Sequence, residues 1–161
     1  MESKSIIDSF LLSNPFHRGM GEILILVGMG ICGLLFSWTK FSIFPVSNIF
    51  GGLLILSAFM FHGRTENEHK QAHERSESID MIVTSGVYAK IRHPLYISII
   101  CMDIGIAIAF GVMATFILAL LAIIHWVLTA LKEEEALLKQ FPDEYARYKQ
   151  QVRWRMIPGI F

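Results

Sequence analysis

The chain has 161 residues, of which 53% are hydrophobic and only 17% are charged, and its mean hydropathy is +0.50. One domain is the expectation for this length, and so little charge excludes a typical soluble domain and favours an integral membrane protein. The formal net charge is zero, so there is no excess of basic residues and no reason to expect nucleic acid as a partner.

Residues 1–19 are expected to form an interfacial lead-in to the membrane domain. The segment lacks a basic region followed by an apolar run and a cleavage site, so it does not resemble a signal peptide. Ile6, Ile7, Phe10 and Leu11 share one face of a helix, which is typical of a segment that lies in the membrane interface.

Three apolar runs follow this lead-in. Residues 23–38 are expected to form the first span, and residues 41–61 the second. The third run, 97–131, contains 35 residues with Asp103 as its only residue charged at pH 7. A single helix of that length would extend about 52 Å at about 1.5 Å per residue, whereas the hydrocarbon core is about 30 Å thick. The run must therefore fold back, and Phe110-Gly111 is the expected turn.

The resulting fold class is an all-α polytopic membrane protein with four transmembrane helices, a C-terminal helical hairpin and a helical tail. All 161 residues form a single domain. Its expected parts are the lead-in 1–19, spans one and two in 20–61, a loop over 62–93, the hairpin 94–131 and the tail 132–161.

Charge bias predicts the orientation of the spans. Lys and Arg gather in the segment 62–96 and in the tail, whereas the link between the first two spans carries only Lys40 and the hairpin turn carries none. By the positive-inside rule, the loop, the tail and both termini face the cytoplasm, and we expect a prokaryotic cytoplasmic membrane.

The tail is expected to be helical on both sides of Pro142. Residues 133–140 continue the fourth helix, and Pro142 ends it and opens another helix. This last helix places three side chains on one face, against the membrane or over the loop: Tyr145, Tyr148 and Val152. Residues 153–155, Arg-Trp-Arg, are interpreted as an interfacial anchor at least as readily as part of a site.

The hairpin should bring polar side chains from both of its ends together. Packed helices lie about 8–10 Å apart, and counting from the turn places Tyr96 and His125 at the same depth. Arg92 and His93 then lie level with residues 129–133. Basic groups at a helix N-terminus add to the positive end of its dipole, so this mouth favours an anion such as a carboxylate.

Glu133, Glu134 and Glu135 follow near the end of the fourth helix, where the helix dipole disfavours acidic side chains. Their position suggests a role in binding ribose hydroxyls or a cation. Each feature also has a simpler explanation. The three acids could form a solvated helix face with Lys132 and Lys139. Independently, Arg92 could be a membrane anchor that reaches lipid phosphates.

Other polar residues allow similar alternatives. His125 lies within a span, so it is either functional or hydrogen-bonded to a neighbouring helix. Asp103 is at a depth similar to that of Asn48, which predicts a structural polar pair as readily as a role in the site. His69 and His73 have a spacing that suits a metal, but one such pair in a loop is a weak signal, and we expect no metal.

Two motifs carry a resemblance to a known family. The first is Gly86-x-Tyr88 followed by Arg92-His93-Pro94-x-Tyr96. The second is Glu133-Glu134 followed by Leu137, Phe141, Tyr145 and Tyr148, and then by Arg155-Met156-Ile157-Pro158. Together they resemble the signature of the isoprenylcysteine carboxyl methyltransferase family and its phospholipid methyltransferase relatives. The resemblance covers residues 82–158, with the hydrophobic hairpin in between.

This resemblance implies an integral membrane methyltransferase that uses S-adenosylmethionine. The cofactor would lie between segment 82–96, the mouth of the hairpin and the tail. The residues that would bind it are Gly86, Tyr88, His93, Tyr96, Glu133 and Glu134, with a ribose contact as the natural role for one of the two acids. The residues given catalytic roles are Arg92, near the methyl acceptor, and Glu133.

The expected acceptor is a lipophilic carboxylate such as a prenylcysteine-like group, which Arg92 can position with two hydrogen bonds. A phospholipid amine is an alternative, and it requires a base such as His125, Asp103 or a glutamate. An NADPH-dependent sterol-type reductase shares an Arg-His-Pro-x-Tyr-like region and is another. The last is a non-catalytic protein with four spans whose polar mouth contacts lipid head groups or a partner. The oligomeric state stays open.

Overall fold

The computed structural model describes residues 6–41, 43–71, 74 and 78–161. Its elements in chain order are α1 (Ile6–Leu11), α2 (Pro15–Leu35), α3 (Val46–Glu68), the short 3-10 helix η2 (Gly86–Ala89), α4 (Pro94–Phe110), α5 (Met113–Gln140) and α6 (Pro142–Gln151). Outside the helices, the described residues form two isolated β-bridges and no named strand. The all-helical prediction is confirmed.

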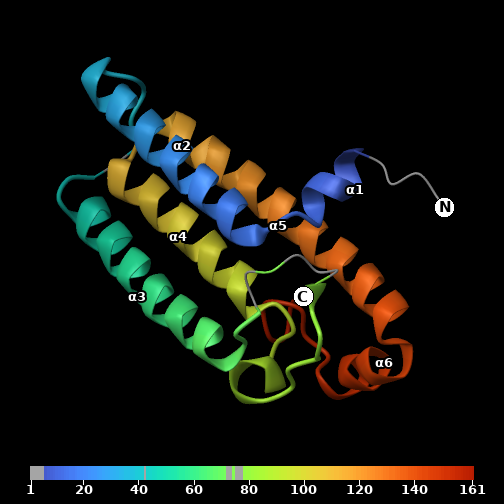
Figure 1. Cartoon of the computed structure of the whole chain (residues 1–161). Helices are drawn as coiled ribbons and strands as arrows, with labels where there is room; N and C mark the ends of the chain where they lie inside the picture. Colours follow the sequence, from blue (N-terminus) through green and yellow to red (C-terminus); the bar gives the residue numbers. More distant parts are fainter. Residues whose placement is uncertain (1–5, 42, 72–73, 75–77) are drawn as a thin grey trace.

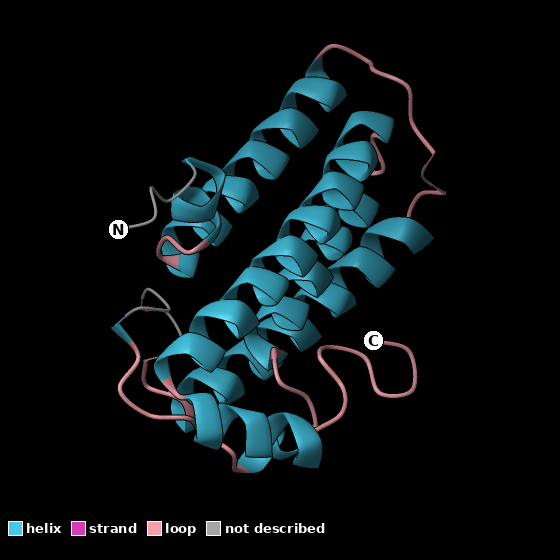
Figure 2. Ribbon diagram, turned by 90° about the vertical axis from the view of Figure 1, so that its right-hand side faces the viewer, coloured by secondary structure: helices cyan, strands magenta, loops and turns pink. Residues whose placement is uncertain are grey.

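The four long helices form a bundle around α4, which packs against α2, α3 and α5 (Figures 1 and 2). Three of them, α2, α3 and α5, are long and apolar enough to cross a membrane. Helix α4 is apolar but has only 17 residues, which extend about 26 Å. The loop after α3, η2 and α6 gather at one end of the bundle, shown at the bottom of Figure 1.

Helix α2 begins earlier than the sequence pattern predicted. It starts at Pro15, so residues 15–19 belong to this helix and not to an interfacial lead-in. The side chain of Asn14 caps the helix, because its Oδ1 accepts hydrogen bonds from the amides of Phe16 (2.9 Å) and His17 (3.4 Å). Proline lacks a backbone N–H, but the first residues of a helix have no helical acceptor for that group, so Pro15 costs no hydrogen bond there.

Helix α3 is also displaced from the expected range. It spans Val46–Glu68, so it begins five residues later than position 41 and ends seven residues beyond position 61. Pro45 immediately precedes it, and the backbone before Pro45 pairs elsewhere. The amide of Phe41 donates to the carbonyl of Gly111 at 2.9 Å, which fixes this connection to the turn of the hairpin.

The predicted turn between α4 and α5 is confirmed. Helix α4 ends at Phe110, and Gly111 adopts the left-handed conformation with φ of 64°. Its amide donates to the carbonyl of Ala107 at 2.9 Å, which closes the last turn of the helix. Glycine takes this conformation without a steric cost, so the position suits a sharp reversal between two apolar helices.

Helices α3 and α4 approach each other closely at two glycines. A Cβ on Gly51 would lie 2.5 Å from the amide nitrogen of Ala109 and 2.6 Å from the carbonyl oxygen of Gly105. A Cβ on Gly105 would in turn lie 2.8 Å from Cγ1 of Ile55. Small residues at such crossings let helix backbones pack directly, and this van der Waals packing contributes to the association of helices within a bilayer.

Substitution of Gly51 by alanine is therefore expected to destabilise the bundle by about 1–3 kcal/mol, because backbone atoms of α4 would have to move. The matched control is Gly52→Ala, where a Cβ meets no atom within 4 Å and little change is expected. Thermal unfolding in detergent micelles measures both. Equal melting temperatures for the two variants would show that the α3–α4 contact is not close.

Candidate active site

The loop before α4 and the C-terminal tail pair along their backbones at the mouth of the hairpin. The amide of Arg92 donates to the carbonyl of Trp154 at 3.0 Å, and the amide of His93 donates to the carbonyl of Arg155 at 2.7 Å. Ile91 and Trp154 form a parallel β-bridge at the same place. These bonds fix the two consecutive basic side chains beside the last turns of α5.

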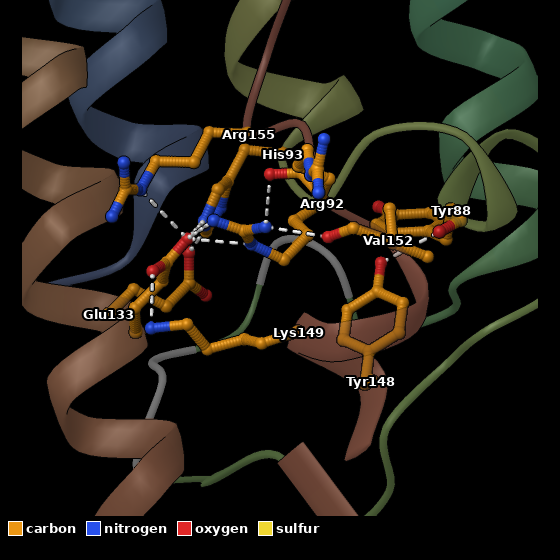
Figure 3. A network of polar contacts seen from close by, with 10 residues as sticks. Tyr88, Arg92, His93, Glu133, Tyr148, Lys149, Val152 and Arg155 are labelled. Atoms are coloured by element: carbon orange, nitrogen blue, oxygen red, sulfur yellow. Dashed lines mark hydrogen bonds and ion pairs between the residues drawn. The ribbon is translucent and has the colours of Figure 1, made fainter. Parts of the chain in front are cut away.

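Glu134 on α5 is the centre of the polar network at this mouth. Figure 3 labels the basic residues that surround it, namely Arg92, His93, Lys149 and Arg155. Its Oε1 accepts from Nε and Nη2 of Arg92, both at 2.8 Å, and from Nε of Arg155 at 3.1 Å. The same oxygen lies 3.3 Å from Nε2 of His93, and Oε2 lies 3.2 Å from Nζ of Lys149. The residue is 2% exposed, so one buried carboxylate joins cationic groups from the loop, α6 and the tail.

Arg92 makes contacts with all three of its side-chain nitrogens. Besides the bonds to Glu134, its Nη1 donates to the carbonyl oxygens of Val152 (2.6 Å) and Arg153 (2.8 Å). The side chain is buried, although it reaches the wall of the hollow described below. The guanidinium therefore ties the loop to α5 and to the tail at once.

His93 lies between two carboxylates. Its Nδ1 is 3.3 Å from Oε2 of Glu133, and its ring stacks on Tyr96 with centroids 5.4 Å apart and planes 6° apart. Both ring nitrogens face acceptors, which is the arrangement of an imidazolium. Burial lowers the pKa of His93, but the hydrogen bonds and charges of Glu133 and Glu134 outweigh it, so the net shift is upward.

This raised pKa gives a pH dependence with a defined sign. The stabilisation from the His93 imidazolium is fully present below its ordinary pKa of 6.5, and it is lost as pH rises through the raised value. The melting temperature should therefore fall as pH increases above 6.5, and His93→Gln should flatten that slope. His17→Gln, at an exposed histidine, is the control and should keep it. Parallel curves for wild type and His93→Gln would contradict the assignment.

A hollow of about 520 Å³, its open mouth included, lies between the loop, α4, α5 and α6. Five of the predicted site residues line it: Tyr88, Arg92, His93, Tyr96 and Glu133. Two do not line it. Glu134 lies behind the wall in the polar network, and Gly86 lies at the start of η2. The hollow is thus an open cavity whose walls carry one glutamate, one arginine, two histidines and four tyrosines.

Gly86 shapes the loop where it meets α3. Its φ is +58°, and a Cβ there would lie 2.1 Å from a carboxylate oxygen of Glu68. The next amide, that of Val87, donates to the same carboxylate at 2.5 Å. Only glycine combines this backbone conformation with such a close approach, so Gly86 allows η2 to carry Tyr88 into the hollow.

Three aromatic residues of the hollow were not predicted as site residues. Tyr145 and Tyr148 come from α6, and the hydroxyl of Tyr148 donates to the carbonyl of Tyr88 at 2.8 Å. Burial raises the pKa of both tyrosines, so they remain neutral donors. The sequence indicated only that the two tyrosines share one face of the last helix, which was expected to lie against the membrane or over the loop. In the structure this face lies over the loop.

His69 is the third aromatic residue of the hollow that was not predicted as a site residue. Burial lowers the pKa of His69, although the charge of Glu133 opposes this shift. Its proposed metal partner His73 lies outside the described residues. Among the residues that the structure describes, no group of three or more potential metal ligands is present.

The structure decides between open alternatives for two further residues. Arg155 belongs to the polar network, as one of its two interpretations allowed, because its Nε contacts Glu134; its guanidinium lies 5.0 Å from the ring centroid of Phe161. Asn48 does not pair with Asp103; its side-chain amide donates to the carbonyl of Ala109 at 2.7 Å. The later start of α3 places Asn48 near the turn of the hairpin, beyond the depth of Asp103.

His125 is hydrogen-bonded to a neighbouring helix, as one of its two interpretations predicted. Its Nδ1 contacts the carboxylate of Glu22, and its Nε2 lies 2.9 Å from Nη1 of Arg18, both on α2. Its neighbour Trp126 packs on Tyr96 with ring centroids 5.0 Å apart, which confirms that His125 and Tyr96 lie at a similar depth.

Comparison with known families supports a shared origin for most of the bundle. Residues 24–144, about three quarters of the 161 residues, match the family model described as phospholipid methyltransferase. The match includes α3, α4, α5 and the loop that carries the paired basic residues. A search of curated proteins gave no match. With its apolar helices and the extent of this match, the chain belongs to the phospholipid methyltransferase family of membrane enzymes.

Proposed function

We propose that this protein transfers the methyl group of S-adenosylmethionine to a membrane lipid. The observation that carries the proposal is the hollow at the loop end of the bundle, in which Glu133, His93 and Tyr96 converge from α5, the loop and α4. Membership of a methyltransferase family supports a methyl donor in this hollow. The charge bias of the sequence predicts that this end of the helices faces the cytoplasm.

The residues of the hollow suit the chemistry of this donor. S-adenosylmethionine supplies an electrophilic methyl group on a sulfonium, whose other two substituents are an amino-acid chain and the ribose of adenosine. Glu133 would accept hydrogen bonds from ribose hydroxyls or from the ammonium. The His93 imidazolium would hold the carboxylate of the amino-acid end. The rings of Tyr88 and Tyr96 would face the cationic sulfur, to which their negative faces are attracted.

The remaining predicted residues would act by fixing these groups. Glu134 would keep the cationic side chains of the loop and tail in place. Gly86 would set the path of the loop. Arg92 would bind an acceptor anion only by sharing nitrogens that already contact Glu134 and two carbonyls. A carboxylate acceptor at Arg92 therefore requires a rearrangement of this network.

A phospholipid amine is a second candidate acceptor, and two observations favour it. The family match names phospholipids, and the His125–Glu22 pair provides a proton acceptor near the aromatic wall of the hollow. An ammonium must lose a proton before its nitrogen can attack the methyl carbon, whereas a carboxylate is already ionised. With either acceptor, the protein's main contribution is to align the reacting atoms and to exclude water.

Purified protein in lipid vesicles, supplied with S-adenosylmethionine that carries a radiolabelled methyl group, tests the proposal. One set of vesicles contains phosphatidylethanolamine, a second contains a farnesylated cysteine with a free carboxylate, and a third contains only phosphatidylcholine. We expect label in the lipid extract of the first or second set and none in the third. Absence of label from both acceptors would contradict lipid methylation.

A further inference from the structure

A second polar cluster lies between α2 and α5, apart from the hollow. Nη1 of Arg18 lies 2.9 Å from Nε2 of His125 and donates to Oγ1 of Thr129 at 2.8 Å. Glu22 accepts from Nδ1 of His125 with one carboxylate oxygen and from Nε1 of Trp126 (2.7 Å) with the other. A positive and a negative group are thus held on either side of one imidazole.

Arg18 is a buried cation whose hydrogen-bonding capacity is not used up. The residue is 9% exposed, and its Nε has no hydrogen-bond partner among the described residues. Its guanidinium lies 5.0 Å from the ring centroid of Trp126 and 5.7 Å from that of Phe10. An arginine in a membrane helix is costly unless its donors are paired, so the unpaired Nε is available to an acceptor oxygen of a ligand.

The cluster shares an aromatic wall with the proposed cofactor site. The rings of His125 and Trp126 are 4.9 Å apart, those of Trp126 and Tyr96 are 5.0 Å apart, and those of Tyr96 and His93 are 5.4 Å apart. Four consecutive rings therefore connect the two polar sites. A head group bound beside Arg18 would therefore lie against rings that continue to the proposed cofactor site.

An apolar groove begins at the cluster and runs along α2 and α5. Its lining residues are Glu22, Ile25, Leu26, Leu118, Leu121, Ala122 and His125, and it encloses about 450 Å³ with its open side included. Its polar end is at Glu22 and His125, and the rest lies deeper along the bundle. Ile25 and Leu121 are more than half exposed, so the groove opens toward the surrounding lipid.

We propose that Arg18, Glu22 and His125 form the head-group site for a zwitterionic phospholipid acceptor. Arg18 binds the phosphate, Glu22 binds the ammonium while His125 holds the two charged groups apart, and one acyl chain lies in the groove along α2 and α5. The charges match a phosphoethanolamine head group, which carries one anion and one cation two carbons apart. A head group with only a carboxylate would satisfy Arg18 but would place like charge beside Glu22. This inference rests on the proposed methylation of a phospholipid amine.

Binding of three lipids with identical acyl chains to the purified protein in neutral detergent tests this assignment. Phosphatidylethanolamine carries both charges, phosphatidic acid lacks the amine, and diacylglycerol lacks the whole head group. Wild type should bind phosphatidylethanolamine at least tenfold more tightly than diacylglycerol. Arg18→Gln should weaken both phosphate-bearing lipids tenfold or more, and Glu22→Gln should weaken phosphatidylethanolamine but not phosphatidic acid. Both variants should keep their affinity for S-adenosylhomocysteine within twofold.

The groove is tested without touching the cluster. Leu121→Trp fills it and should weaken all three lipids about fivefold, whereas Leu120→Trp, at a neighbouring exposed position outside the groove, should have no effect. Equal binding of phosphatidylethanolamine and diacylglycerol by wild type would overturn the proposal, and so would undiminished binding by Arg18→Gln. Head-group selectivity without methyl transfer to any lipid would instead contradict the proposed function and leave this binding site intact.

Discussion

Glu134→Ala should lower the free energy of unfolding by roughly 3–5 kcal/mol, because it leaves buried cationic groups without their carboxylate. Arg92 is 7% exposed and would lose the acceptor for two of its nitrogens, while His93, Lys149 and Arg155 would lose the group that they share. The loop before α4 and the tail would then separate from α5, and binding of S-adenosylhomocysteine should be lost with them.

The neighbouring residue gives a matched control for this substitution. The side chain of Glu135 is 60% exposed and pairs with Lys132 at 3.0 Å on the helix surface. Surface pairs of this kind contribute about 1 kcal/mol or less, so Glu135→Ala should change the melting temperature little. Melting temperatures and ligand binding in the same detergent compare the two variants. An equal, small effect of both would show that the Glu134 network is not important for the structure.

Glu133→Gln should weaken binding of S-adenosylhomocysteine tenfold or more, which corresponds to about 1.4 kcal/mol. The substitution keeps the shape of the side chain but removes the charge that faces His93 and the hollow. His93→Ala should have an effect of similar size, because it removes the partner proposed for the amino-acid end. Isothermal titration of each purified variant measures the affinity.

The comparison between adjacent acids makes this prediction specific. Glu133 lines the hollow, whereas Glu134 lies behind its wall, so Glu133→Gln should reduce affinity with only a small change in melting temperature. If Glu133→Gln and His93→Ala both bind with the affinity of wild type, these residues do not belong to the cofactor site. A fall in melting temperature as large as that of Glu134→Ala would assign Glu133 a structural role instead.

The hairpin was predictable because chain length and bilayer thickness are incompatible with one straight helix over residues 97–131, and Gly111 marks the reversal. The start of α2 was not. Arg18 and Glu22 resemble residues of a surface segment until their partners on α5 are known, and those partners lie more than 100 positions away in the chain. Pairing across the bundle makes these charges compatible with a membrane helix, and local patterns do not reveal it.

In the site, too, the contacts between motif residues were predictable from the sequence, whereas the contacts made by the returning tail were not. The motifs and the hairpin together predicted that Arg92 and His93 would meet Glu133 and Glu134, and the structure brings these four residues into contact. The contribution of Lys149 was missed and that of Arg155 was left open, because both depend on the return of the tail to pair with the loop. A charge spacing that signals this return is absent from the sequence.

Titration of the purified wild-type protein with S-adenosylhomocysteine, and separately with NADPH, tests most directly whether the hollow is a methyl-donor site. We predict saturable binding of S-adenosylhomocysteine at one site, with an affinity in the micromolar range, and no binding of NADPH. Binding of NADPH alone would support a reductase, and binding of neither ligand would contradict the assignment of the hollow as a cofactor site.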